Sequence, residues 1–192
     1  AMKVADSTVV LVEAVAGVEV GTEAVWAAAD AYKRPRLMVV NKMDRENVRV
    51  NRVLESIRSN LHGHFVQLQI PIGEGASFKG VIDLLSMEAR LGEKGDKGPI
   101  PADMASAVED ARLALIEAAA EGEDALIEKY LEGEELTAEE IARGLKQAVI
   151  NGAVVPILFA AGEQGIGVDA LLDACVSLPP APNEAGNFEA TD

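Results

Sequence analysis

The stretch Arg36-Leu37-Met38-Val39-Val40-Asn41-Lys42-Met43-Asp44 decides the fold, because an unbroken apolar run passes directly into a polar tetrapeptide. A short run of valine and other large apolar residues without polar alternation is typical of a strand buried on both faces of a parallel sheet. The sequence therefore predicts a strand over 36–40, followed by a loop over 41–44 whose polar side chains are available to a ligand.

The side chains of this loop suit a guanine base. Asp44 can accept hydrogen bonds from the ring N–H and the exocyclic amino group of guanine, which lie side by side. Adenine presents an acceptor in place of the ring N–H, so the carboxylate would stay partly unpaired against it. Lys42 can lay its aliphatic stem along the purine face, and Asn41 can hold the loop and reach the base edge. Met43 has no role in contacting the base. The alternative interpretation of the tetrapeptide is a plain turn without a ligand.

The flanking sequence predicts an α/β core. Its apolar periodicity predicts further strands over 8–14 and 154–160 and helices over 22–32, 50–61 and 168–178. Thr22 is expected as the N-cap of the first helix, and Pro179 and Pro180 end the last one. Together these elements predict a parallel sheet with helices on both faces.

A second pattern separates the two halves of this core. Strands are predicted over 66–70 and 81–85 with a possible third over 88–91, then a polar loop over 92–101 and helical sequence over 103–131, interrupted near Gly122. Thr137 and Glu140 form a capping box that begins a helix over 138–150. We therefore expect a core over 1–65 and 151–182, an inserted α+β subdomain over 66–150, and a linker over 183–192 toward a missing downstream domain.

Several segments spread along the chain resemble the nucleotide-binding domain of the elongation factor G family, the ribosomal translocation GTPases. They are Lys3–Asp6, Val15–Glu19, Asn41–Asp44, Gln69–Gly73, Phe78–Leu84, Glu128–Leu136 and Gly167–Ala174. The resemblance implies an inserted subdomain at this place. It also implies a second guanine contact in the loop Ala161-Gly162-Glu163, where the family has Ser-Ala and a backbone N–H meets the base oxygen. A flexible connection is the alternative for this loop.

The phosphate-binding motif of such GTPases is absent from the sequence. No Gly-x-x-x-x-Gly-Lys-[Ser/Thr] run occurs, and no Asp-x-x-Gly precedes Val4. We therefore expect an incomplete P-loop GTPase fold, a fragment that hydrolyses no GTP on its own and has no catalytic residues. The resemblance implies GTP or GDP with Mg²⁺ in the parent protein, with no nucleotide tightly bound to this chain.

The charge and cysteine content limit the classes of partner. A net charge of −15, from 32 acidic and 17 basic residues, disfavours direct contact with nucleic acid. Glu117 and Glu121 stand four residues apart on a predicted helix, and the resemblance implies that this face meets the basic stalk protein of the large ribosomal subunit. The alternative is an ordinary solvated face.

One cysteine, Cys175, favours a reducing, cytoplasmic compartment, and no metal site or membrane segment is predicted.

The sequence is also compatible with other functions. The chain could be a divergent paralogue, a stand-alone acidic protein-binding module with a vestigial guanine loop, or part of a release-factor recycling or ribosomal protection GTPase. The segment Phe78–Leu84 favours the elongation factor G type over the last two.

Overall fold

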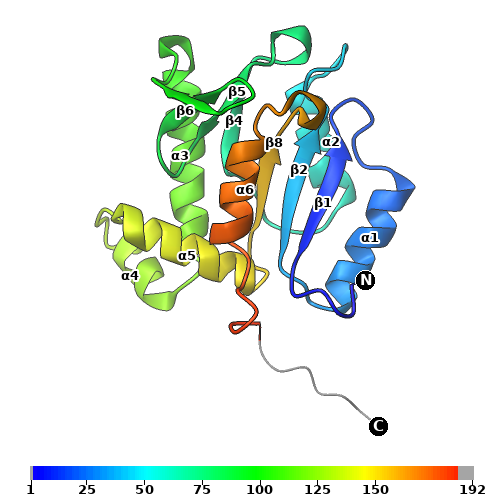
Figure 1. The fold of residues 1–192 in the computed structure, drawn as a ribbon. Helices are drawn as coiled ribbons and strands as arrows, with labels where there is room; N and C mark the ends of the chain where they lie inside the picture. Colours follow the sequence, from blue (N-terminus) through cyan, green and yellow to red (C-terminus); the bar gives the residue numbers. More distant parts are fainter. Residues whose placement is uncertain (1, 186–192) are drawn as a thin grey trace.

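The computed structural model describes residues 2–185, in which two four-stranded sheets stand next to each other (Figure 1). The core sheet is parallel with the order β1-β2-β8-β3, and the second sheet is antiparallel with the order β4-β5-β6-β7. The predicted α/β class, with a parallel sheet and an α+β insert, is confirmed. The strands are β1 (Thr8–Glu13), β2 (Arg36–Asn41), β3 (Phe65–Gln67), β4 (Gln69–Ile72), β5 (Gly80–Asp83), β6 (Glu88–Leu91), β7 (Asp96–Gly98) and β8 (Val155–Phe159).

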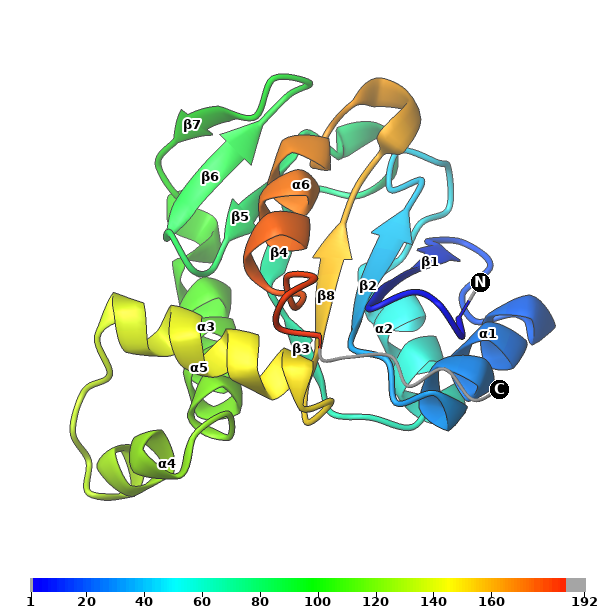
Figure 2. The ribbon, with the colours of Figure 1, turned by 60° about the horizontal axis from the view of Figure 1, so that its bottom comes forward.

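Helices cover both faces of the core sheet, as predicted. Successive residues of β2 point to opposite faces. Met38 and Val40 therefore pack with α1 (Val20–Ala31) and α2 (Val50–Asn60), whereas Leu37 and Val39 share a core with α6 (Val168–Ser177). Figure 2 shows α6 in front of β8, with α1 and α2 on the far side of the sheet.

The first helix begins earlier than the sequence predicted. Thr22 is not its N-cap; Glu19 takes that place, and the hydroxyl of Thr22, three residues later, accepts a hydrogen bond from the Glu19 N–H at 3.3 Å. The two side chains form a reciprocal capping box that satisfies N–H groups in the first turn. The sequence prediction missed this capping box because its residues are reversed. The usual box has Ser or Thr at the N-cap and Glu or Gln three residues later.

The strand predicted over 66–70 is divided between the two sheets. Phe65 to Gln67 pair with β8 in the parallel sheet, and Gln69 begins the antiparallel sheet. Leu68 joins them, because its N–H donates to the carbonyl of Ile157 and its carbonyl accepts from the N–H of Leu84. A continuous β pattern in the sequence does not reveal such a change of partners.

The second unit, which runs from β4 to α5, packs its antiparallel sheet against helices. The short 3-10 turn η1 (Gly75–Ser77) joins β4 to β5, and a second one, η2 (Ala102–Met104), comes before the first helix. The helices are α3 (Ala105–Ala120), α4 (Asp124–Leu131) and α5 (Ala138–Ile150). The break predicted near Gly122 has a packing reason: a Cβ at Gly122 would collide with the backbone of Gly144 on α5. The loop predicted over 92–101 is partly wrong, because it contains β7.

The capping box of α5 is confirmed. The Thr137 hydroxyl accepts from the Glu140 N–H at 3.3 Å, and the Glu140 carboxylate accepts from the Thr137 N–H at 2.7 Å. Of the expected linker over 183–192, residues 186–192 lie outside the described part of the structure. Before that point, Glu184 forms an ion pair with Lys146 of α5 at 2.9 Å.

Candidate functional site

Two loops converge at the carboxyl edge of the core sheet. Strand β2 lies between β1 and β8, with Asn41 opposite Glu13 and Val40 opposite Phe159. Because parallel neighbours end at the same edge, the loop after β2 and the loop after β8 must lie next to each other, at the place where open α/β sheets bind ligands. We call them the first loop, Asn41–Asp44, and the return loop, Ala160–Gly167.

Asn41 connects the two loops directly. Its backbone carbonyl accepts from the Ala14 N–H at 2.9 Å, and its side-chain Oδ1 accepts from the Gly162 N–H at 3.0 Å. The predicted role of Asn41 in holding the loop therefore has a defined geometry: one amide side chain spans the gap between neighbouring strand ends.

Lys42 and Met43 turn in different directions. Lys42 has a φ of +61° and is exposed, and its Nζ lies 3.0 Å from Oε2 of Glu13. Met43, the position predicted to have no role toward the base, is fully buried and packs in the core. Its N–H donates to the carbonyl of Ala160, and its carbonyl accepts from the N–H of Gly75, which ties the first loop to the return loop and to the second unit.

Asp44 stands half-buried at the wall of an open hollow of about 590 Å³. The hollow is lined by Glu13, Val15, Lys42, Asp44, Arg45 and Glu46. Oδ2 of Asp44 accepts from Nε2 of Gln164 at 3.2 Å. A carboxylate has about four lone-pair sites, so this bond leaves acceptor capacity for further donors.

The backbone donors of Ala161 and Gly162 in the return loop are already engaged. Ala161 is buried and donates its N–H to the carbonyl of Ile166, while the Gly162 N–H is taken by Asn41. Among residues 2–185 the N–H of Glu163 has no acceptor, and the exposed Glu163 carboxylate pairs with Arg45 at 3.2 Å. Of the three predicted residues of this loop, only Glu163 therefore presents a free backbone donor.

Sequence reasoning missed two side chains of the site. Gln164 contacts Asp44, although no local pattern marks it, because the partners are 120 residues apart. Glu13 contacts Lys42, and its position at the end of β1 was a signal that could have been used, since neighbouring parallel strands end together.

Glu117 and Glu121 lie far from the two loops. Both are exposed at the carboxyl end of α3, and Oε2 of Glu121 lies 3.2 Å from Nδ1 of His64. Because His64 directly precedes β3, this contact stands at the amino edge of the parallel sheet, opposite the first loop. The acidic pair and the loops are therefore separate surfaces.

The Asp44 carboxylate and the Lys42 side chain line the same hollow. The free N–H of Glu163 lies on the return loop, which Asn41 joins to the first loop. Within residues 2–185 no group of three or more His, Cys, Asp or Glu side chains is placed to hold a metal ion. None of the helices described is both long enough and apolar enough to cross a membrane.

Comparison with known proteins agrees with this geometry. Residues 1–181 match the family described as elongation factor Tu GTP binding domain. A crystal structure from Thermus thermophilus is similar with a TM-score of 0.87 and 35% sequence identity, over 95% of this chain and 28% of that one. The chain thus spans well under half of the length of this relative. The parallel sheet, the inserted second sheet and the match over residues 1–181 show that the chain belongs to the family of elongation factor Tu GTP-binding domains.

Proposed function

We propose that this chain carries the guanine-reading part of a translational GTPase of the elongation factor G type, acting at the ribosome in the cytoplasm. The family match supports the coarser function, a GTP-binding domain of a translation factor. The observation that carries the proposal is the bond from the Gly162 N–H to Asn41 Oδ1, which joins the two loops beside Asp44.

In the proposed complex, Asp44 accepts from the ring N–H and the amino group of guanine. Gln164 already donates to Oδ2 of this carboxylate, which keeps it oriented toward the hollow. The free N–H of Glu163 supplies the donor for the base oxygen, and the Lys42 stem covers one face of the ring. Asn41 fixes the distance between the two loops. Base recognition then comes from a carboxylate and a backbone donor held on adjacent strand ends.

GTP or GDP with Mg²⁺ is the ligand that the family implies, and the metal would neutralise charge on the phosphates. The 192 residues contain no phosphate-loop motif, so we propose that they contact the base only and do not catalyse hydrolysis. Because phosphate contacts are then lacking, we expect a weak complex whose selectivity nevertheless follows the base.

An NMR titration tests this proposal without requiring tight binding. We expect GDP to shift the amide signals of Gly162, Glu163 and Gln164 in the ¹⁵N-labelled chain, while ADP leaves them in place. The Asp44→Ala variant should lose the response to GDP. Equal shifts with GDP and ADP, or an unchanged response in Asp44→Ala, would contradict the assignment.

A change of base preference gives a sharper version of this test. Xanthine carries a carbonyl oxygen where guanine has the amino group, so an amide that can both donate and accept suits it better than a carboxylate. Asp44→Asn should therefore favour XDP over GDP, by about tenfold in the ratio of affinities. Asp6 does not line the hollow, so Asp6→Asn is the matched control and should leave the ratio of XDP to GDP affinity unchanged.

For the second surface, we propose that Glu117 and Glu121 attract the basic stalk protein of the large ribosomal subunit. Both carboxylates are exposed, so this end of α3 presents negative charge to solvent, although like charges four residues apart near a helix C-terminus destabilise the helix. Glu117→Lys with Glu121→Lys should slow association at low salt. The control Glu134→Lys with Glu135→Lys makes the same charge change on the exposed segment after α4. Equal association rates for the two pairs would contradict this role, and docking without any guanine response would favour an acidic protein-binding module.

A further inference from the structure

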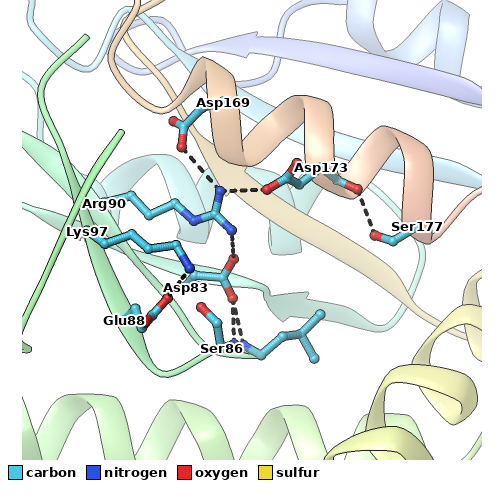
Figure 3. Close-up of polar contacts among 9 residues, drawn as sticks. Asp83, Ser86, Glu88, Arg90, Lys97, Asp169, Asp173 and Ser177 are labelled. Carbon is cyan, nitrogen blue, oxygen red and sulfur yellow. Dashed lines mark hydrogen bonds and ion pairs between the residues drawn. The ribbon is translucent and has the colours of Figure 1, made fainter. Parts of the chain in front are cut away.

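Arg90 crosses from the second sheet to α6 at the seam between the two units (Figure 3). It lies on β6, and its side chain is 14% exposed. Nη1 contacts Oδ2 of Asp173 at 2.6 Å and Oδ2 of Asp169 at 3.2 Å, and Nη2 lies 3.6 Å from Oδ2 of Asp83. A cleft of about 180 Å³ between β5 and α6 is lined in part by these groups.

The charges at this seam depend on Arg90. Three aspartates face one guanidinium, and Asp83 is itself oriented by the N–H groups of Leu85 and Ser86 at 2.9 and 3.0 Å. Burial lowers the pKa of Arg90, but the hydrogen bonds to Asp173 and Asp169 outweigh it and leave the pKa raised, so the side chain stays charged. Without it, the carboxylates of the second sheet and of α6 would repel one another.

The same seam borders both ends of the return loop. Asp169 lies in the first turn of α6, directly after the loop, and Gly95 of the β6–β7 turn packs so closely on it that a Cβ would collide. A Cβ on Gly165 would lie 2.8 Å from Cγ of Glu93 in the same turn. At the other end, the buried Oε1 of Gln69 accepts from the N–H of Phe159 at 3.2 Å.

We propose that Arg90 is a positioning residue for guanine recognition, which couples the second unit to the base site. By tying β6 to the first turn of α6, it holds the return loop in register with the first loop. A partner that binds the second unit then changes guanine affinity by tightening or loosening this contact. The role in recognition rests on the function proposed above, whereas the tether itself can be measured without nucleotide.

Hydrogen exchange of the nucleotide-free chain tests the tether. The N–H groups of Ala161 and Val168 are bonded within the return loop, to Ile166 and Gly165, and report on its order. Arg90→Met keeps most of the apolar stem of the side chain but removes the guanidinium and its charge, and we expect exchange at these two amides to rise about tenfold. Exchange in α2, on the far side of the sheet, reports global opening and should rise much less.

Lys97→Met is the matched control. Lys97 pairs with Glu88 at 2.7 Å, a contact between β7 and β6 that does not reach α6. It should leave the return loop unchanged, and Arg90→Lys should restore part of the protection. If Arg90→Met does not fold, Asp173→Asn removes the negative charge from the shortest contact, at a carboxylate that is 65% exposed, and a smaller rise confined to the return loop is expected.

The outcomes separate the two proposals. Equal rises in α2 and in the return loop, or the same local rise in Lys97→Met, would overturn the positioning role of Arg90. A local rise together with a loss of the GDP response supports both the tether and its link to recognition. A local rise in a chain that never distinguishes GDP from ADP leaves the tether standing and overturns the guanine assignment and the link to it.

Discussion

The two loops of the candidate site reach the same edge of the sheet by different means. The first loop follows a strand that its own sequence specifies, and Met43 anchors it from within by full burial. The return loop has two glycines at positive φ, Gly165 at +73° and Gly167 at +78°, and depends on contacts with Asn41, Gln69 and the β6–β7 turn. Local sequence therefore specifies the strand that leads into the first loop, while the return loop is held by contacts with distant segments.

Substitution at Gly167 should break the return loop with the largest effect. Gly167→Ala places a side chain at positive φ and sets Cβ 2.5 Å from the carbonyl oxygen of Phe159. We expect a loss of roughly 2–4 kcal/mol in the free energy of unfolding. Urea denaturation measures it.

Gly152→Ala is the control for that variant, because Gly152 has a φ of +73° but nothing within 4 Å of its Cβ position. It should cost only the backbone strain, about 1 kcal/mol. Equal losses in the two variants would show that the close approach to β8 is unimportant.

Removing the bridge between the loops should have an intermediate effect. Asn41→Ala deletes the acceptor of the Gly162 N–H, and since this donor is exposed, water replaces the bond. Thermal unfolding should show a loss of about 1 kcal/mol. Asn51→Ala, at an exposed position on α2, serves as the control. If hydrogen exchange at Gly162 were unaffected by Asn41→Ala, the bridge would not hold the loop.

The capping box of α5 offers a locally encoded element far from both loops. Hydrogen bonds from Lys129 and from the Thr137 N–H lower the pKa of Glu140 to about 2. A lowered folded-state pKa means that the carboxylate stabilises the fold above its ordinary pKa and loses this contribution as the pH falls toward about 2. Glu140→Gln should therefore lower Tm at neutral pH by a few degrees, with a difference that disappears in acid.

Glu139→Gln is the control for the acid titration, since Glu139 is exposed in the same first turn. It removes the same charge without touching the capping box. A Tm difference for Glu140→Gln that persisted near pH 2 would contradict the assignment of this stabilisation to the carboxylate.

The smallest effect on stability is expected at Gln164. Its bond to Asp44 lies at the surface, so Gln164→Ala should change the free energy of unfolding by less than about 0.5 kcal/mol. It should nevertheless weaken the response to GDP, because Asp44 loses the partner that orients it. A stronger response would show instead that Gln164 competes with the base for the carboxylate.

The sequence by itself determined the elements whose information is local. The apolar run before Asn41, the capping box at Thr137 and the helical stripe that ends near Gly122 each predicted an element close to its observed bounds. The residue types of the first loop were enough to predict a guanine contact, because the donor and acceptor pattern of a base can be matched to single side chains.

Only the tertiary structure decided how these elements are joined. It divided the predicted strand at Leu68, buried Met43, and brought Gln164 and Arg90 to partners on distant segments. The physical reason is that hydrogen bonds and ion pairs between remote residues depend on which strands lie side by side, and the periodicity of a single segment carries no information about its neighbours.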